Sequence, residues 1–143
     1  MADIFHDFLV KAPAARVFEA ISTPRGLDCW WTKNSAGEPK LGAEYELGFG
    51  PSYLWRARVS KRAGTSAFEF EMTHADADWT GTRVGFQLEE KGGTTNARFH
   101  HTGWPNANEH WRISCYCWAM YLRIMRRYVE HGEFVPYEKR LDV

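Results

Sequence analysis

The sequence of 143 residues has no excess of charge of either sign. Its 18 basic and 18 acidic side chains cancel, and no long block of like charge interrupts the chain. Proteins that bind nucleic acids or anionic membrane surfaces use clustered positive charge to attract them. The balance therefore argues against both kinds of partner.

Cysteine is scarce as well. The chain has three cysteines, Cys29, Cys115 and Cys117. An odd number without paired spacing does not fit a zinc site or a disulfide framework. His100 and His101 are adjacent, so on a strand they point to opposite faces and make a poor pair of metal ligands. We expect reduced thiols in a cytoplasmic protein, with no metal and no other cofactor.

Long uninterrupted hydrophobic runs are missing too. The most apolar long segment, near residues 111–129, is broken by four arginines: Arg112, Arg123, Arg126 and Arg127. A membrane span needs about 20 predominantly apolar residues, so insertion into a membrane is not expected. The start of the chain carries Asp3, His6 and Asp7 among its apolar residues, which excludes a typical export signal there.

Aromatic side chains, in contrast, are abundant. Seven Trp and nine Phe contribute to an aromatic content of 15%, which exceeds what a small core ordinarily needs. A chain of this length buries roughly 70% of its unfolded surface and is typical of one domain. We predict a single domain over residues 1–143, with a core at 3–132 and a tail at 133–143 that docks back onto it.

The first third of the chain predicts a strand followed by two short helices. Ile4–Lys11 reads as the strand, and Ala12-Pro13 suits the first turn of a helix that reaches about Ile21. Thr23-Pro24 then supplies an N-cap and a proline for a second helix, which ends near Trp30-Trp31.

From residue 43 the hydrophobic period changes to two over five successive runs, which indicates an antiparallel meander. One face of the predicted sheet carries charged residues, and Arg56 and Arg58 are expected to face Glu69 and Glu71. The other face is mostly apolar and carries Tyr45, Leu47, Phe49, Tyr53, Trp55, Ala57, Val59, Phe68, Phe70, Met72, Val84, Phe86, Leu88, Ala97, Phe99 and His101.

A long helix is predicted at the C-terminal end. Asn106 and Glu109 have the spacing of a capping box, with Asn106 as the N-cap, and Gly132 provides the stop. The helix would span about 25 residues, or about 37 Å. Its inward stripe is Trp111, Cys115, Trp118, Leu122, Met125 and Val129.

The order of these elements resembles the helix-grip (Bet v 1-like) fold of the START-like (SRPBCC) superfamily, an α+β class. The segments Ala12–Ile21, Thr23-Pro24, Trp30-Trp31 and His101-Thr102-Gly103-Trp104, with the helix that contains Trp118, are similar to its activator of Hsp90 ATPase homologue 1-like branch. The resemblance covers residues 3–132. It implies a curved antiparallel sheet around the C-terminal helix, and an internal cavity for lipids, polyketides or aromatic metabolites.

Ten residues are candidates for lining that cavity, because large rings offer rigid contact area to an apolar ligand. The alternative is that the rings pack only against one another. Removing Trp118 should cost less stability if it borders an open pocket than if it lies in a packed core, and we expect the smaller cost. The candidates are Trp55, Phe68, Phe70, Phe86, Phe99, His101, Trp104, Trp111, Trp118 and Leu122.

The function favoured by these observations is binding of a small, largely apolar molecule, without chemistry of the protein's own. One alternative is a cyclase or hydrolase in which His101 or His6 acts as a base, with Asp7, Glu71 or a water as partner. Another is a chaperone-associated interaction module, as the name of the similar branch implies.

Two surface features are also noted. Phe5 and Leu9 lie on the outer face of the first predicted strand and suggest a homodimer along it. Arg123, Arg126 and Arg127 could recognise an anion, but they also complement the dipole of the predicted helix and are typical of a solvated face.

Overall fold

The computed structural model describes residues 2–143, which form one seven-stranded antiparallel sheet and three α-helices. The strand order is β1-β7-β6-β5-β4-β3-β2, so β1 and β2 are the edges. The elements in chain order are β1 (Ala2–Val10), α1 (Ala14–Ser22), α2 (Pro24–Leu27), β2 (Asn34–Ala36), β3 (Glu44–Gly48), β4 (Leu54–Ala63), β5 (Ala67–His74), β6 (Arg83–Lys91), β7 (Thr94–Trp104), α3 (Glu109–His131) and the 3₁₀-helix η1 (Tyr137–Asp142).

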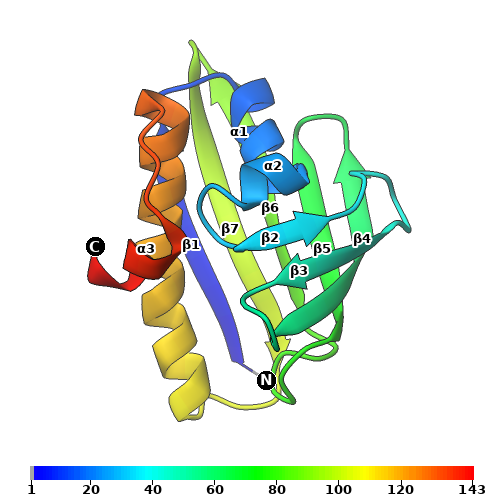
Figure 1. Cartoon of the computed structure of the whole chain (residues 1–143). Coiled ribbons are helices and arrows are strands. Elements are labelled where there is room, and N and C mark those ends of the chain that lie inside the picture. The colour runs from blue at the N-terminus through cyan, green and yellow to red at the C-terminus, as the bar shows by residue number, and fades with distance from the viewer. Residues whose placement is uncertain (1) are drawn as a thin grey trace.

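Figure 1 shows the long helix α3 running along the sheet beside β1, with α1 and α2 near its C-terminal end. This is the helix-grip arrangement, and it confirms the predicted α+β fold. The first and last strands are paired antiparallel, and His6 lies opposite Phe99. The pairing places the first and the last strand of the chain side by side, at the edge of the sheet that α3 follows.

The predicted alternation is visible in the burial of the strands. On β3 and β4, Tyr45, Leu47, Ala57 and Val59 are buried, while their sequence neighbours Glu44 and Glu46 are exposed. Tyr45 also donates a hydrogen bond from its hydroxyl to the Ser22 carbonyl oxygen at 2.6 Å. The apolar face of the sheet therefore holds the core, between the strands and the three helices.

Two details of the elements differ from the prediction. The N-cap of α3 is Asn108, whose Oδ1 accepts the Trp111 N–H at 2.9 Å, so Asn106 is not the cap. Glu109 is therefore the first helical residue and not the third, and α3 has 23 residues. The strand β2 was not predicted, because three polar or small residues carry no period of their own.

The C-terminal tail packs back onto the domain through Arg140, which is 1% exposed. Its guanidinium donates to the carbonyl oxygens of Asp28 (2.6 Å), Thr32 (3.0 Å) and Val135 (3.0 Å). Tyr137 donates to the Phe49 carbonyl oxygen at 3.1 Å. These bonds fasten η1 to the segment that follows α2.

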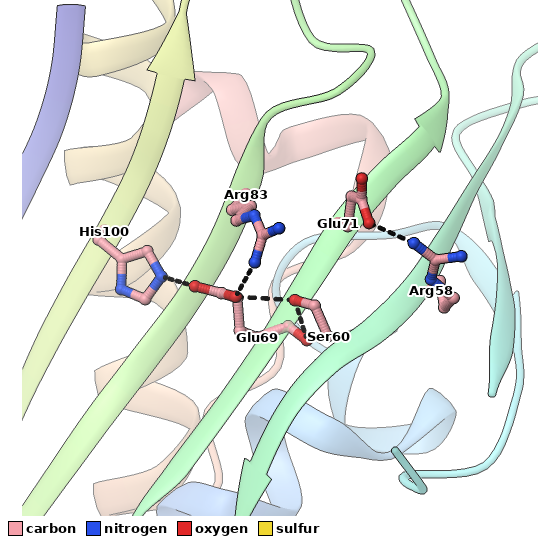
Figure 2. A network of polar contacts seen from close by, with 6 residues as sticks. All are labelled: Arg58, Ser60, Glu69, Glu71, Arg83 and His100. Atoms are coloured by element: carbon pink, nitrogen blue, oxygen red, sulfur yellow. Dashed lines mark hydrogen bonds and ion pairs between the residues drawn. The ribbon is translucent and has the colours of Figure 1, made fainter. Parts of the chain in front are cut away.

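The outer face of the sheet carries a polar network centred on Glu69 (Figure 2). Arg58 faces Glu71 as predicted, at 2.5 Å, but Glu69 reaches the other way, to His100 Nε2 at 2.7 Å. Ser60 also donates to the Glu69 carboxylate at 2.8 Å. Burial would raise the pKa of Glu69, but the hydrogen bonds from His100 and Ser60 outweigh it and lower that pKa to about 2.

Candidate functional site

The ten predicted cavity residues all lie in or against the core. Trp55 and Trp111 are half-buried. The other eight are buried: Phe68, Phe70, Phe86, Phe99, His101, Trp104, Trp118 and Leu122. Their placement puts aromatic rings from β4, β5, β6, β7 and α3 into one interior.

Trp118 is the centre of this aromatic interior. Its ring centroid lies 4.6 Å from that of Phe99, 5.2 Å from that of Trp31 and 5.7 Å from that of Trp79. Offset and tilted ring pairs at such distances each add about 0.5 to 1.5 kcal/mol beyond the area they bury. The side chain thus connects α3 to the sheet and to the segment after α2.

A cavity remains where Trp118 meets the sheet, but it is small, about 10 Å³. That is at the lower limit for a single water molecule. Its lining comprises Ile21, Leu27, Trp30, Trp31, Phe68, Phe70, Val84, Gly85, Phe86 and Trp118. The rings fill most of the space that the resemblance implied for a ligand, so a larger molecule enters only if some of them move.

His101 lies beside this cluster and both of its ring nitrogens are engaged. Trp118 Nε1 donates to His101 Nδ1 at 3.0 Å, so the proton of the neutral ring is on Nε2. That nitrogen donates to Thr82 Oγ1 at 2.8 Å, and Thr82 donates to the Trp79 carbonyl oxygen at 2.5 Å. Every group in this chain of three hydrogen bonds has a partner.

This geometry does not support His101 as a catalytic base. Burial lowers the pKa of His101 from 6.5 to about 3, and neither nitrogen is free to take a proton. The carboxylates weighed as its partners are elsewhere, since Glu71 is bound to Arg58 on the outer face and Asp7 lies 3.8 Å from Arg98. The imidazole instead orients Trp118.

Three other indole N–H groups are buried and have no hydrogen-bond partner within residues 2–143. They belong to Trp79, Trp104 and Trp111. The rings of Trp79 and Trp104 are neighbours, with centroids 5.9 Å apart. A buried donor without an acceptor costs roughly 1 to 3 kcal/mol, and such groups are uncommon in folded proteins. An acceptor brought in by another molecule would remove that cost.

The structure does not bring all ten residues to one place, and only Phe68, Phe70, Phe86 and Trp118 line the small cavity. Leu122 lines a separate pocket beside His6 and Phe8, at the seam of β1 and α3. His6 itself lies with Nε2 3.3 Å from the Cys115 carbonyl oxygen.

Six of the ten residues that line the cavity were not among the candidates: Ile21, Leu27, Trp30, Trp31, Val84 and Gly85. Trp30 and Trp31 line the cavity, although the sequence analysis placed them only at the end of a helix and among the segments of the family resemblance. Two adjacent large aromatic residues were the feature of the sequence that could have indicated a buried position for this pair. Thr82 comes from the turn before β6 and carried no signal, since its role depends on where His101 lies.

Within residues 2–143, no group of three or more His, Cys, Asp or Glu side chains is arranged to hold a metal ion. In the same part of the chain, no helix combines the length and the apolar character needed to cross a membrane.

The fold is shared with solved structures. The Aha1 dimer from Colwellia psychrerythraea, solved in solution, superposes with a TM-score of 0.82 at 26% identity, over 93% of this chain and 99% of that one. The protein SSP2350 from Staphylococcus saprophyticus gives 0.78 at 18% identity, over 94% and 96%. DynU16, described as belonging to the dynemicin biosynthetic locus, gives 0.78 at 18% identity, over 94% of this chain and 50% of that one.

A comparison with curated proteins found no match. A family model, however, covers residues 11–130 and is described as Activator of Hsp90 ATPase homolog 1-like protein. That range contains α1, the cavity-lining strands and nearly all of α3. The chain belongs to the family of Activator of Hsp90 ATPase homolog 1-like proteins.

Proposed function

We propose that the protein binds a small, largely apolar molecule that carries a hydrogen-bond acceptor, in the interior between the sheet and α3. The observation that carries this proposal is the set of unpartnered indole N–H groups of Trp79, Trp104 and Trp111. Small-molecule sites usually combine apolar walls with a few fixed polar groups. None of the three tryptophans lines the present cavity, so a ligand would reach their N–H groups only after neighbouring rings move.

The ligand that suits this interior is an aromatic ketone, ester or lactone. Its rings would replace ring–ring contacts around Trp118, and its carbonyl oxygen would accept from an indole N–H. A molecule without an acceptor would leave those donors unpaired and gain less on binding. The family membership and the neighbour from a biosynthetic locus, DynU16, support a ligand-binding role.

Entry requires side chains to move, because the cavity measures about 10 Å³. Trp31 is the side chain we expect to move first. It comes from the segment after α2, which is not part of the sheet. The tail holds that segment in place through Arg140, so its movement requires those hydrogen bonds to loosen. Binding is therefore expected to be slow compared with diffusion-limited association.

Benzophenone and diphenylmethane test this function, since they differ only in a carbonyl group in place of a methylene. Calorimetry should show benzophenone binding with one site per chain, and tighter than diphenylmethane by about tenfold, the value of one net hydrogen bond. Equal affinity of the two compounds, or no heat with either, would remove the proposed role of the indole donors.

We also propose that two copies of the chain associate along β1. Phe5 is 64% exposed and Leu9 is 61% exposed on the outer face of this edge strand. The similar structure from Colwellia psychrerythraea is described as a dimer. Sedimentation should give a dimer for the native protein and a monomer for the double variant Phe5→Ser, Leu9→Ser, whereas a native monomer at high concentration would contradict the proposal.

We also propose a cytoplasmic location, because the cysteines of this protein are free thiols. Cys29, Cys115 and Cys117 are free cysteines and all are half-buried. Proteins of reducing compartments keep such thiols without disulfides. Fractionation of cells with an antibody to this protein would test the location.

A further inference from the structure

A second pocket lies outside the aromatic interior, at the seam between β1 and α3, and has a volume of about 160 Å³. Phe8 of β1 and Ala119 and Leu122 of α3 give it apolar walls. His6 adds a ring that is held in place at Nε2 by the Cys115 carbonyl oxygen, at 3.3 Å. A cavity of about 150 Å³ holds one benzene ring. The pocket therefore has the size and walls for a single aromatic ring.

Two arginines also line this pocket, the exposed Arg123 and the half-buried Arg126. They are three residues apart on α3, so they lie on the same face of the helix, and like charges at this spacing destabilise a helix. Arg127 adds a third cation one turn from Arg123. Within residues 2–143, none of the three arginines has an ion-pair partner.

The acidic groups close by are already engaged. Asp7 lines the pocket, but its carboxylate lies 3.8 Å from Arg98 Nε. Glu130 follows Arg126 by four residues, yet its carboxylate accepts the Lys11 N–H at 2.7 Å. The pocket thus presents an apolar floor and a positive rim.

The helix dipole does not account for both arginines. Its effect on a charged side chain falls off within the last turn of a helix. The helix α3 ends at His131, so Arg123 lies about two turns before its end. Arg126 is half-buried against the pocket, unlike a fully solvated surface residue.

We propose that this pocket is a binding site for a small aromatic carboxylate. The ring lies between Phe8 and Leu122, and the carboxylate pairs with the guanidinium groups of Arg123 and Arg126. Arginine suits this role because its planar fork matches a carboxylate with two parallel hydrogen bonds. The site is separate from the interior proposed above, and its ligand differs in charge.

Benzoate and its uncharged isostere benzamide test the proposal, by ligand-observed NMR and calorimetry on the full chain. Benzoate should bind and benzamide should bind at least about tenfold more weakly. Raising the ionic strength from about 0.01 M to about 1 M should weaken benzoate binding severalfold, because the rim is open to solvent.

Matched variants locate the site. Arg126→Gln and Arg123→Gln should each weaken benzoate binding about tenfold. Arg126→Lys should keep part of the affinity, because it retains the charge without the fork. Arg112→Gln, on the same helix outside the pocket, should change nothing.

Three results would overturn the proposal. One is equal binding of benzoate and benzamide, another is an equal loss in Arg112→Gln and Arg126→Gln, and the third is no benzoate binding by a folded native chain. Benzophenone binding in the interior serves as the independent control. Since it does not involve Arg126, it should persist in Arg126→Gln whether or not benzoate binds.

Discussion

His101 illustrates how a residue that looks catalytic in sequence can be structural. Its parity with Phe99 on β7 correctly indicated that it faces inward, and it is fully buried. What the sequence did not reveal is that Trp118 and Thr82 occupy both ring nitrogens. Those partners come from a helix and a turn that are distant in sequence, so their positions follow only from the packed fold.

The neutral state of His101 predicts a loss of stability in mild acid. The unfolded chain binds a proton at this residue near pH 6.5, whereas the folded chain does so only near pH 3. Between these values the unfolded state holds more protons, so the free energy of unfolding falls as the pH falls. From pH 6.5 to about 5 the loss should be roughly 2 kcal/mol.

Urea unfolding of the native protein and of His101→Gln across this range measures the effect. Glutamine can still accept from Trp118 and donate to Thr82, but it does not titrate. The variant should therefore show a shallower pH dependence than the native chain. Parallel curves for the two proteins would show that His101 does not carry the effect.

Trp118→Ala is the second prediction at this scale. The sequence analysis expected an open cavity, in which this substitution would cost little stability. The interior is instead almost filled, and Trp118 is 2% exposed. The expected loss is about 3 to 5 kcal/mol in the free energy of unfolding, as for large-to-small changes in a packed core. Denaturant titration measures it, and a loss below about 1 kcal/mol would indicate an interior that is loosely packed around this ring.

At the scale of elements, the strands with regular alternation and the long helix were predictable, because period and capping are local properties. The strand β2 was not predictable, because its three residues, Asn34–Ala36, are too few and too polar to show a hydrophobic period. The strand is recognised only from its pairing with β3. The contact between the Glu69 carboxylate and His100 could not be predicted from the sequence either. It depends on Gly85, which lies in register between these two residues on β6.

Gly85→Ala tests this arrangement. An added Cβ would lie 2.5 Å from the Phe68 carbonyl oxygen and 2.8 Å from Glu69 Cα, so the strands must shift. We expect a loss of about 1 to 3 kcal/mol in the free energy of unfolding. Gln87→Ala, on the same strand and face, is the control and should cost less than about 0.5 kcal/mol. Equal effects of the two substitutions would mean that the close approach at Gly85 is unimportant.

At the scale of the whole molecule, the tail and the core act together. Residues 133–143 were expected to dock, but the buried Arg140 that fastens them could not be recognised as such, because arginine is mostly a surface residue. Its three carbonyl acceptors lie far away in sequence or in an irregular segment. The resulting connection links η1 to the segment that carries Trp31.

Arg140→Met should loosen that connection. The carbonyl oxygens of Asp28 and Thr32 lose a charged donor, so we expect a loss of about 1 to 3 kcal/mol. Hydrogen exchange should quicken at the amides of η1 and at Trp31, while Lys139→Met, an exposed neighbour, leaves both unchanged. Unaltered exchange in Arg140→Met would show that the tail is held by other contacts.

The most direct test of ligand binding in the interior is a titration followed through the indole N–H signals of the seven tryptophans. Single Trp→Phe variants assign the nitrogen–proton correlation peaks, and benzophenone is then added, with diphenylmethane as the control. Benzophenone should move the signal of Trp79, Trp104 or Trp111 downfield, as its carbonyl oxygen accepts the hydrogen bond, and diphenylmethane should not. If all three signals stay in place while benzophenone binds, or if benzophenone does not bind at all, the interior is a packed core and not a ligand site.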